Sequence, residues 1–356
     1  MKRLIQAFSA VFIICFLLIF INNRLNAAEG YSGENTLTVF NWGDYIDPEL
    51  IERFEEETGI KVIYETFDSN EAMLTKIQQG GTSYDVAVPS EYAIEKMIEE
   101  DLLYPIDHSK IPNLKNIDER FLDLSFDPGN KYSVPYFWGT VGILYNPTMN
   151  DKTFTSWNDL WDKDLKNEIL LVDGAREVLG FALNSLHYSL NETDKEKLQE
   201  AKEKLVRLQP NIKAIVGDEI KMLMANEEAS VAVVWSGDAA DVMWENENLD
   251  YVVPEEGSNL WFDNMVIPKT AKNIEGAHQF INFMLDAEVA AQNTEYVGYA
   301  TPNKEAMKLL PDEIVNDKRF YPEPELTERL EVYENLGKEM LGYYNELYLE
   351  FKMHTK

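Results

Sequence analysis

The sequence predicts an α/β fold of two lobes, each a mainly parallel sheet flanked by helices. The chain has 356 residues, which is enough for one large or two medium domains with proper cores. Strand signals and helix signals alternate along it, an order that implies a parallel sheet with helices on both faces. The two alternating sets follow each other without a flexible linker, which predicts ordered crossings between the lobes.

The first alternating set follows a short linker at residues 31–33. Short apolar runs predict strands over residues 37–41, 60–64 and 84–88. Asp47 and Pro48 are a typical N-cap and first helical residue, and Gly59 closes that helix. Further helices are expected from Ser69 to the glycines at 80–81, and from Ser90 to about residue 100.

The second set follows a stretch rich in proline and aspartate, residues 105–130. Strands are expected over residues 132–145, 169–172, 231–235, 251–254 and 261–267. Helices are expected from Ser156, over 176–190 and 218–225, and from a capping box of Thr193 and Glu196 to residue 208. From residue 275 onward the pattern is mostly helical.

The N-terminus predicts export. Lys2 and Arg3 precede an apolar run that ends at Ile21, and a polar stretch then leads to Ala27 and Ala28, the outline of a secretory signal. The apolar run approaches the roughly 17–20 residues of a membrane-spanning helix. Residues 1–28 are therefore either a signal peptide or an N-terminal membrane anchor. The rest of the chain would work in the periplasm or on the outer face of the cytoplasmic membrane.

Composition and motifs exclude several function classes. The 63 acidic residues outnumber the 32 basic ones, and the formal charge of −31 argues against a nucleic-acid partner. The single cysteine, Cys15, lies inside the N-terminal apolar run, so the exported part has no disulfide or thiol chemistry. The four histidines lack the spacing of a metal site, and no nucleophile elbow or phosphate-binding loop is present. The sequence predicts neither an enzyme nor a cofactor.

Aromatic residues recur beside acids where predicted strands end. Trp42 and Tyr45 flank Asp44, in NWGDY. Trp261 and Asp263 lie two residues apart in SNLWFDNMVIP, and a strand would place both on one face. In open α/β sheets the ligand lies beyond the carboxyl ends of the strands, which here are expected near residues 41–45, 89–92, 173–177 and 235–238.

The same pairing appears at three more places. Trp235 stands three residues before Asp238, Tyr92 follows an acid, and Tyr299 lies in GYATPN. An aromatic face attracts an ammonium group by about 2 kcal/mol when desolvated, and a carboxylate adds a hydrogen bond of about 1.5–3 kcal/mol. The pattern predicts a cage for an alkyl amine. Taken singly, each residue also fits a packed aromatic or an aspartate that bonds its own turn.

Five motifs carry a resemblance to a known family: FNWGDYIDPELIERFEEETGIKVIYETFDSNEAML, YDVAVPSEY, GAREVLGFAL, LWFDNMVIP and GYATPN. They closely resemble the spermidine/putrescine-binding proteins of bacterial polyamine ABC transporters, over about residues 36–350. The resemblance implies a type II periplasmic-binding-protein fold whose two lobes close on a polyamine in the cleft between them. It also implies delivery of the polyamine to a membrane permease that works with an ATPase.

The resemblance also implies ligand contacts, residue by residue. It places Trp42, Tyr45, Ser90, Tyr92, Glu177, Trp235, Trp261, Asp263 and Tyr299 in the site, and Asp44 joins them from the aromatic–acid pattern. Gly43 stands where a relative usually has threonine, and Gly174 stands where an aspartate is expected. Asp173, one residue earlier, is expected to compensate. A family glutamine aligns roughly with Tyr333, so spermidine and putrescine both remain open as ligands.

The resemblance implies two lobes assembled from separate stretches of chain. We expect residues 31–138 with 264–310 in the first lobe and residues 139–263 with 311–356 in the second, with a hinge near 138–141 and 264–266. A monomer is expected. Two other functions stay open: a binding protein for another cationic solute, and a polyamine sensor that docks on a signalling receptor.

Overall fold

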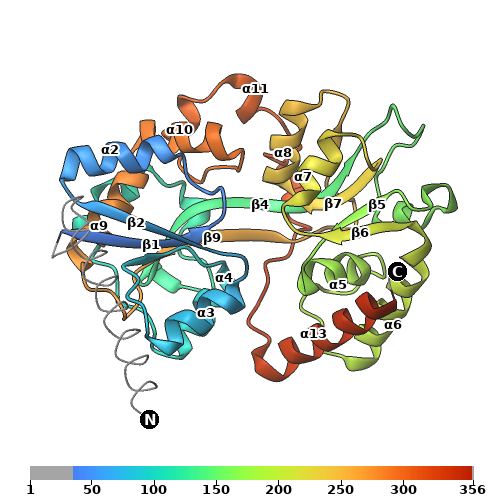
Figure 1. Cartoon of the computed structure of the whole chain (residues 1–356), viewed down its shortest axis with the longest axis horizontal. Coiled ribbons are helices and arrows are strands. Elements are labelled where there is room, and N and C mark those ends of the chain that lie inside the picture. Colours follow the sequence, from blue (N-terminus) through green and yellow to red (C-terminus); the bar gives the residue numbers. More distant parts are fainter. Residues whose placement is uncertain (1–34, 355–356) are drawn as a thin grey trace, which may run out of the picture.

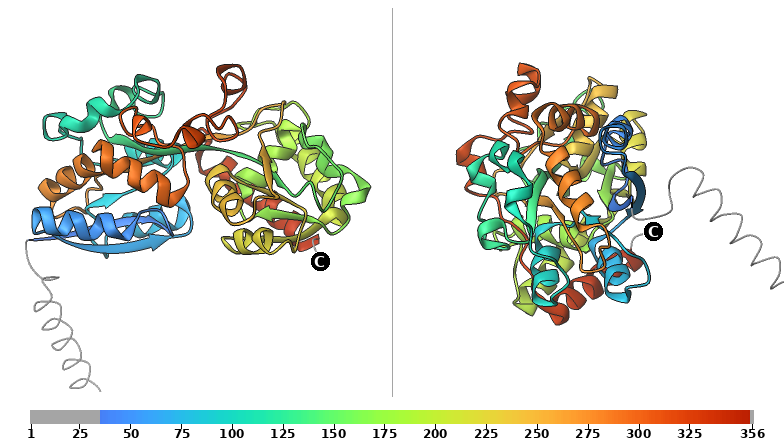
Figure 2. Two further views of the ribbon diagram at one scale, coloured as in Figure 1. Left: turned by 90° about the horizontal axis from the view of Figure 1, so that it is seen from above. Right: turned by 90° about the vertical axis from the view of Figure 1, so that its left-hand side faces the viewer.

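The computed structural model describes residues 35–354, and its two lobes lie side by side (Figure 1). Seen from above, strands run from one lobe into the other (Figure 2). The expected signal peptide or anchor at residues 1–28 lies outside the described residues. Between residues 35 and 354, every helix is too short or too polar to span a bilayer.

In the described part of the chain, nine strands form one mixed sheet in the order β2-β1-β3-β9-β4-β7-β5-β6, with β8 paired to β4. They are β1 (Thr36–Trp42), β2 (Lys61–Phe67), β3 (Val86–Ala87), β4 (Ser133–Tyr145), β5 (Ile169–Val172), β6 (Ile212–Val216), β7 (Val231–Trp235), β8 (Asp250–Val252) and β9 (Leu260–Val266). β1 pairs in parallel with β2 and β3, and β5 pairs in parallel with β6 and β7. We call the half that contains β1–β3 lobe 1 and the half that contains β5–β7 lobe 2.

Helices cover both faces of the sheet in each lobe, as the alternating pattern predicts (Figure 1). They are α2 (Pro48–Thr58), α3 (Asn70–Gln79), α4 (Glu91–Glu99), α5 (Ala175–Asn184), α6 (Lys195–Leu208), α7 (Glu219–Ala225), α8 (Ser236–Glu245), α9 (Ile274–Met284), α10 (Ala287–Val297), α11 (Asp312–Val315), α12 (Pro324–Thr327) and α13 (Gly337–His354). In lobe 1, α2 and α3 lie on opposite faces, and in lobe 2 α8 and α5 do so.

The ends of α2 and α3 are set by local chemistry that is visible in the sequence. The Asp47 side chain accepts a hydrogen bond from the backbone N–H of Glu49, and Gly59 ends α2 in the left-handed conformation at φ 73°. Ser69 caps α3 in the same way, and Gly80 ends it at φ 63°. Both helices therefore begin and end where the sequence predicts.

Strand β4 joins the lobes. It is buried at all 13 positions, so its sequence is a mostly apolar run and does not alternate between apolar and polar residues. Its residues 133–140 pair with β9, while 141–145 pair with β7 and 143–145 with β8. All these contacts are antiparallel. The sheet is consequently parallel within each lobe and antiparallel at its centre, where the two crossing strands run in opposite directions.

Several predicted elements differ from the structure. Asp194, not Thr193, caps α6, and its side chain accepts from the N–H of Glu196. The helix expected over 176–190 ends at Asn184, and Ser156 opens only a 3-10 turn. Residues 298–336 are mostly turns and short helices instead of one helical region. Short polar side chains compete for caps and turns within one or two residues, and sequence patterns resolve such competition poorly.

Strand β6 was not predicted. It lies at the edge of the sheet and pairs only with β5, and most of its residues are half-buried. Lys213 interrupts its apolar pattern, as is usual for a strand with one free edge. This omission affects the site, because the carboxyl end of β6 leads directly to Asp218 and α7.

Candidate ligand-binding site

Asp263 is the centre of the site. It lies on β9 with 6% of its surface exposed, and both of its carboxylate oxygens accept hydrogen bonds. The Tyr45 hydroxyl donates to Oδ2 and the Ser90 hydroxyl donates to Oδ1, each over 2.7 Å. Burial raises the pKa of Asp263 to about 6, while the two hydroxyl donors oppose the rise. Three residues that were predicted for the site are in direct contact.

The sheet order explains why these residues meet. β1 and β3 are parallel neighbours, so the loops that carry Tyr45 and Ser90 leave the sheet at the same edge. β9 lies next to β3, and Ser90 forms an isolated bridge with Asp263. Ser90 occupies the N-cap position of α4, but its hydroxyl makes no cap bond and donates to Asp263 instead. The Ser90 hydroxyl therefore holds Asp263 and does not cap the helix.

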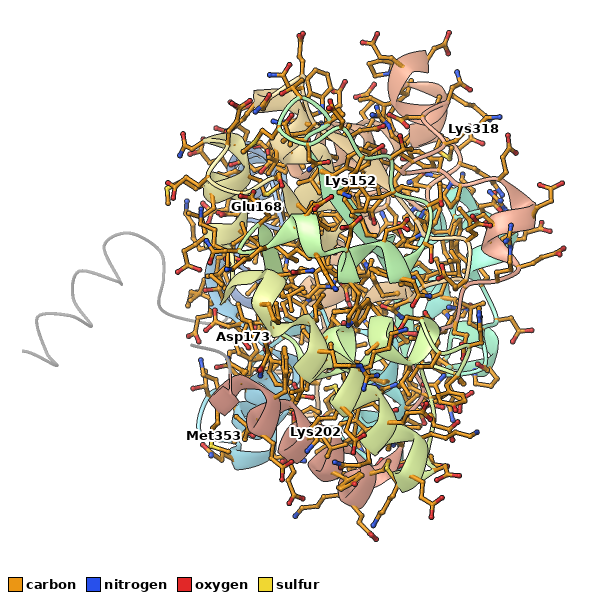
Figure 3. The ribbon with its side chains drawn as sticks, turned by 90° about the vertical axis from the view of Figure 1, so that its right-hand side faces the viewer. Lys152, Glu168, Asp173, Lys202, Lys318 and Met353 are labelled. Atoms are coloured by element: carbon orange, nitrogen blue, oxygen red, sulfur yellow. The ribbon has the colours of Figure 1, made fainter. Side chains whose placement is uncertain are left out.

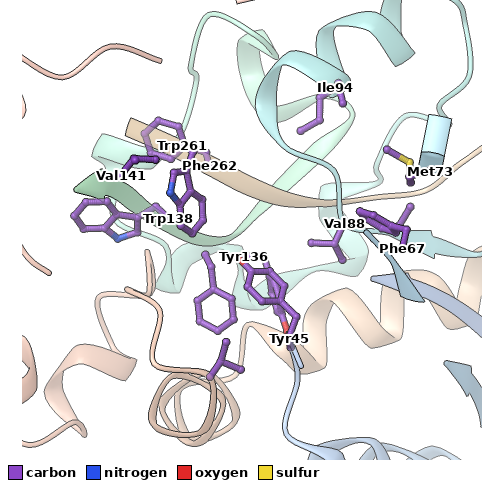
Figure 4. Packing of buried hydrophobic residues seen from close by; sticks show 14 of the residues in the cluster. Tyr45, Phe67, Met73, Val88, Ile94, Tyr136, Trp138, Val141, Trp261 and Phe262 are labelled. Atoms are coloured by element: carbon purple, nitrogen blue, oxygen red, sulfur yellow. The ribbon is translucent and has the colours of Figure 1, made fainter. Parts of the chain in front are cut away.

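Aromatic rings form a wall beside this carboxylate. The rings of Trp261 and Tyr299 lie 5.2 Å apart between centroids at 71°, and those of Tyr45 and Tyr299 lie 5.3 Å apart at 73°. The Phe137 ring packs edge-on against Tyr45 at 5.3 Å. Figure 4 shows Tyr45 next to Tyr136, and Trp261 close to Phe262 and Trp138 in the same buried cluster. Edge-to-face packing of this kind fixes the ring planes.

A second acid, half-buried, lies on lobe 2. Asp238 is in the first turn of α8, and its Oδ1 accepts a hydrogen bond of 3.1 Å from the Tyr299 hydroxyl. Burial raises the pKa of Asp238 to about 6, Lys221 and Tyr299 oppose this, and Asp218 adds to it. Tyr299 therefore connects the ring wall to an acid on the other lobe, which is an arrangement that suits a ligand with two positive ends.

The lobes approach each other at Gly43. A Cβ added there would stand 4.0 Å from Oδ2 of Asp218, the residue before α7. Asp44, the next residue, is exposed and has a left-handed backbone at φ 46°, a conformation that aspartate tolerates better than most residues. Asp44 also adds to the raised pKa of Lys221, which pairs with Asp241 over 3.3 Å. Acids thus line both sides of this approach.

Asn70 holds two of the predicted residues in place. Its amide Nδ2 donates to the Ser90 hydroxyl and to the Tyr92 hydroxyl, each over 3.0 Å, and its Oδ1 accepts from the Ser90 N–H over 3.1 Å. Asn70 is 3% exposed, so this network is shielded from water. The Tyr92 ring packs edge-on against Tyr333, with centroids 6.4 Å apart.

Glu177 is half-buried on α5 and explains why position 174 has no side chain. A Cβ added at Gly174 would stand 2.0 Å from Oε2 of Glu177, so any side chain there would displace that carboxylate. Burial raises the pKa of Glu177, Arg176 opposes this and Glu71 adds to it. Glu177 therefore occupies the space that a larger residue at 174 would need.

The structure places Asp173 elsewhere. Its carboxylate accepts hydrogen bonds from the Tyr348 hydroxyl over 2.7 Å and from the Lys352 ammonium over 2.8 Å, both on α13. These two donors lower the pKa of Asp173 against the effect of its partial burial. In Figure 3 Asp173 lies just above the end of α13 that carries Met353. Its bonds lead to the outer side of lobe 2 and not to Asp263.

Trp42 and Trp235 lie at the carboxyl ends of β1 and β7, and each is half-buried. The Trp42 indole donates to the Val88 carbonyl over 2.9 Å, and its ring packs on Phe67 at 4.5 Å. Trp235 directly precedes the helix that carries Asp238. Their positions at strand ends agree with the prediction, and both residues are partly exposed.

Sequence reasoning missed two residues that the structure places at the site, and it left a third out of the ligand contacts. The third is Asp238, which was noted three residues after Trp235 and within the range expected from the strand ends. Asp218 follows β6, the strand that was not predicted. Asn70 shows no pattern at all, because its partners Ser90 and Tyr92 lie about 20 residues away in sequence.

Comparisons with known proteins identify the family of the chain. Residues 49–322 match the model of a family described as bacterial extracellular solute-binding protein. The chain is similar to the spermidine/putrescine-binding periplasmic protein of Salmonella typhimurium, with 42% identity over 323 residues that cover 90% of this chain and 92% of that protein. It is also 35% identical over 318 residues to a putrescine-binding periplasmic protein of Escherichia coli, covering 83% and 86% of the two chains.

Solved structures agree in fold as well. A structure from Listeria monocytogenes is 68% identical with a TM-score of 0.87, and covers 90% of this chain and 99% of that one. The spermidine/putrescine ABC transporter substrate-binding protein of Streptococcus pneumoniae is 59% identical with a TM-score of 0.81, covering 90% and 100% of the two chains. Since the family model spans most of the described residues and the fold agrees throughout, the chain belongs to the bacterial extracellular solute-binding protein family.

Proposed function

We propose that this protein captures a polyamine, spermidine or putrescine, between its two lobes and delivers it to an ABC permease for import. The observation that carries the proposal is the buried Asp263 carboxylate, held by Tyr45 and Ser90 beside the rings of Trp261 and Tyr299. Relatives that cover most of the chain are named as binding proteins for these two polyamines.

The chemistry of the site suits an alkyl chain with ammonium ends. Each Asp263 oxygen accepts one hydrogen bond from the protein and can accept another, so the carboxylate can bind an ammonium without losing Tyr45 or Ser90. The rings would cover the methylenes, and Asp238 or Glu177 of lobe 2 would take another ammonium. A ligand that bonds acids on both lobes stabilises the closed form over the open one.

We place the working protein outside the cytoplasm, where its relatives are named as periplasmic. A monomer would present both lobes to a permease that is driven by an ATPase. We keep the lobe limits at 31–138 with 264–310 and at 139–263 with 311–356, and the hinge in β4 and β9. The pairing of β4 with strands of both lobes supports a hinge at this place.

Calorimetric titration tests this function directly. Putrescine, spermidine and spermine are titrated into the chain from residue 29 onward, with arginine, lysine and thiamine as cationic controls. We expect saturable binding of at least one polyamine, together with a rise in melting temperature because ligand binds only the folded form. Binding of a control cation in preference to every polyamine would instead support a different cationic solute.

A further inference from the structure

Glu91 lies between two residues of the predicted site, and it is the acid that Tyr92 follows, but it was not among the expected ligand contacts. It is the first residue of α4, flanked by Ser90 and Tyr92. Its side chain is completely buried at 0% exposure. An ionisable side chain is almost never fully buried unless it is paired. A helix that begins at the surface would leave this carboxylate in water, so its complete burial requires another explanation.

One oxygen of Glu91 holds strand β9. Oε2 accepts a hydrogen bond of 2.9 Å from the backbone N–H of Phe262. Phe262 is the residue between Trp261 and Asp263, so this bond fixes the strand where it carries both. Side chains alternate along a strand, and a rotation of the peptide at Phe262 would turn its two neighbours away together.

Two further contacts join the start of α4 to β9 next to this bond. The N–H of Asn264 donates to the Pro89 carbonyl over 3.0 Å, and the Ser90 hydroxyl reaches Asp263 over 2.7 Å. β3 is only two residues long and ends at Ala87. Beyond that end, Glu91 takes over the role of a neighbouring strand by offering an acceptor to an N–H of β9.

The other oxygen of Glu91 is buried and, among the described residues, has no hydrogen-bond partner. Burial raises the pKa of Glu91 to about 8, the Phe262 N–H and Arg176 oppose this and Asp263 adds to it. Arg176 belongs to α5 of lobe 2, where its guanidinium stacks 4.2 Å from the Tyr333 ring centroid. A protonated Glu91 has the shape and the acceptor of a glutamine, so its charge is not needed for the bond to Phe262.

We propose that Glu91 is a positioning residue of the amine site: its carbonyl oxygen holds the Phe262 peptide so that Trp261 and Asp263 face the ligand. The inference rests on the proposed polyamine function and deepens it. Glu91 acts through β9 and does not touch the ligand. The hydrogen bond therefore matters for affinity, and the negative charge does not.

Two conservative variants separate the bond from the charge. Glu91→Gln keeps an acceptor at the same distance and removes the charge, while Glu91→Asp keeps the charge on a side chain one methylene too short to reach Phe262. By calorimetry with putrescine and spermidine we expect E91Q to bind within about threefold of the original chain. We expect E91D to bind about tenfold more weakly, as for residues that orient a ligand-binding group.

The melting temperatures of the ligand-free variants are measured as a control. Values within a few degrees of each other show that affinity was compared between folded proteins. Equal affinity of E91D and the original chain would overturn the positioning role. So would a loss in E91Q that matches or exceeds the loss in E91D, because that result makes Glu91 a charged ligand of the amine. If the original chain itself binds no polyamine, the proposed function fails first and the two failures are distinguished.

Discussion

Asp263 illustrates how a single buried carboxylate can be ready for a cation. Its two hydroxyl donors, Tyr45 and Ser90, partly compensate for its removal from water, and they leave lone pairs for an ammonium. A raised pKa of about 6 still permits ionisation at neutral pH. An ammonium that bonds the remaining lone pairs would stabilise the buried carboxylate further. The site therefore favours a cation.

Asp263→Asn should weaken polyamine binding at least tenfold. The amide keeps the shape and one acceptor but loses the charge-assisted hydrogen bond, which is worth about 1.5–3 kcal/mol. Calorimetry with putrescine and spermidine measures the loss. Asp164→Asn is the control, since Asp164 is an exposed surface acid 3.5 Å from Lys152. Unchanged affinity in D263N, or an equal loss in D164N, would contradict this assignment.

The ligand-free protein should melt at a higher temperature at about pH 5.5 than at about pH 7.5, by roughly 2–5 °C. The pKa values of Asp263 and Asp238 are raised from 3.8 to about 6 in the folded chain, and that of Glu91 is raised from 4.5 to about 8. The folded form therefore binds more protons than the unfolded form in this range. The stability that these protons contribute is lost as pH rises through about 6 for the two aspartates and through about 8 for Glu91. Thermal scans at the two pH values measure the difference.

The double variant D263N/D238N provides the control for that experiment, because amides do not titrate. Its two melting temperatures should differ less than those of the original chain. Saturating polyamine should stabilise the original chain more at the higher pH, where both acids are ionised. A pH dependence that is identical in the double variant would show that other groups cause it.

At the scale of elements, the first turn of α8 must leave room for the side chain of Tyr299. Gly237 lies in its first turn, and a Cβ added there would stand 2.3 Å from the Tyr299 ring. A glycine normally weakens a helix by about 0.5–1 kcal/mol relative to alanine. Here the glycine gives room to the tyrosine that links the ring wall to Asp238.

Gly237→Ala should therefore weaken polyamine binding about tenfold without stabilising the protein, because the added methyl displaces Tyr299. Gly342→Ala is the matched control on α13, where nothing lies within 4 Å of the added Cβ. It should raise the melting temperature slightly and leave affinity unchanged. Calorimetry and thermal scans of both variants test this prediction. Normal polyamine binding by G237A would show that Tyr299 is dispensable for binding.

At the scale of the whole molecule, the two lobes are connected by more than the crossing strands. The N–H of Asn335 donates to Glu95 over 2.8 Å, and its side-chain amide donates to Glu99 over 3.0 Å. Both acids lie on α4 of lobe 1, while the neighbouring Glu331 pairs with Ser258 and Leu260 at the approach to β9. These contacts join the two lobes in the arrangement that the structure shows, and we expect them to stabilise the closed form.

The double variant Glu95→Ala/Glu99→Ala should weaken polyamine binding about three- to tenfold. It removes two hydrogen bonds of about 0.5–1.5 kcal/mol each from the closed form, and the measured affinity falls with the share of the competent form. Glu57→Ala removes an ion pair with Arg53 within α2 and serves as the control. An equal effect of the two changes on calorimetric affinity would exclude a specific role for the lobe contact.

The sequence by itself determined the features that depend on neighbours along the chain. Helix α2 between Asp47 and Gly59, the long apolar strand β4, the acidic balance and the aromatic–acid pairs could all be predicted, because caps and periodicity act over a few residues. The strand ends near residues 41–45, 89–92, 173–177 and 235–238 were predicted for the same reason, while most of the individual ligand contacts came from the family resemblance. Edge strand β6 was not, since one free edge removes the apolar run.

Only the tertiary structure decided which of these residues meet. Asp173 and Asp263 look alike in sequence, yet the first bonds to α13 and the second is held by Tyr45 and Ser90. Asn70 carries no local signal, although it orients Ser90. Hydrogen bonds between side chains that lie tens to hundreds of residues apart depend on how the strands are ordered in the sheet. No local pattern records that order, so the partners of each acid emerge only when the lobes are folded.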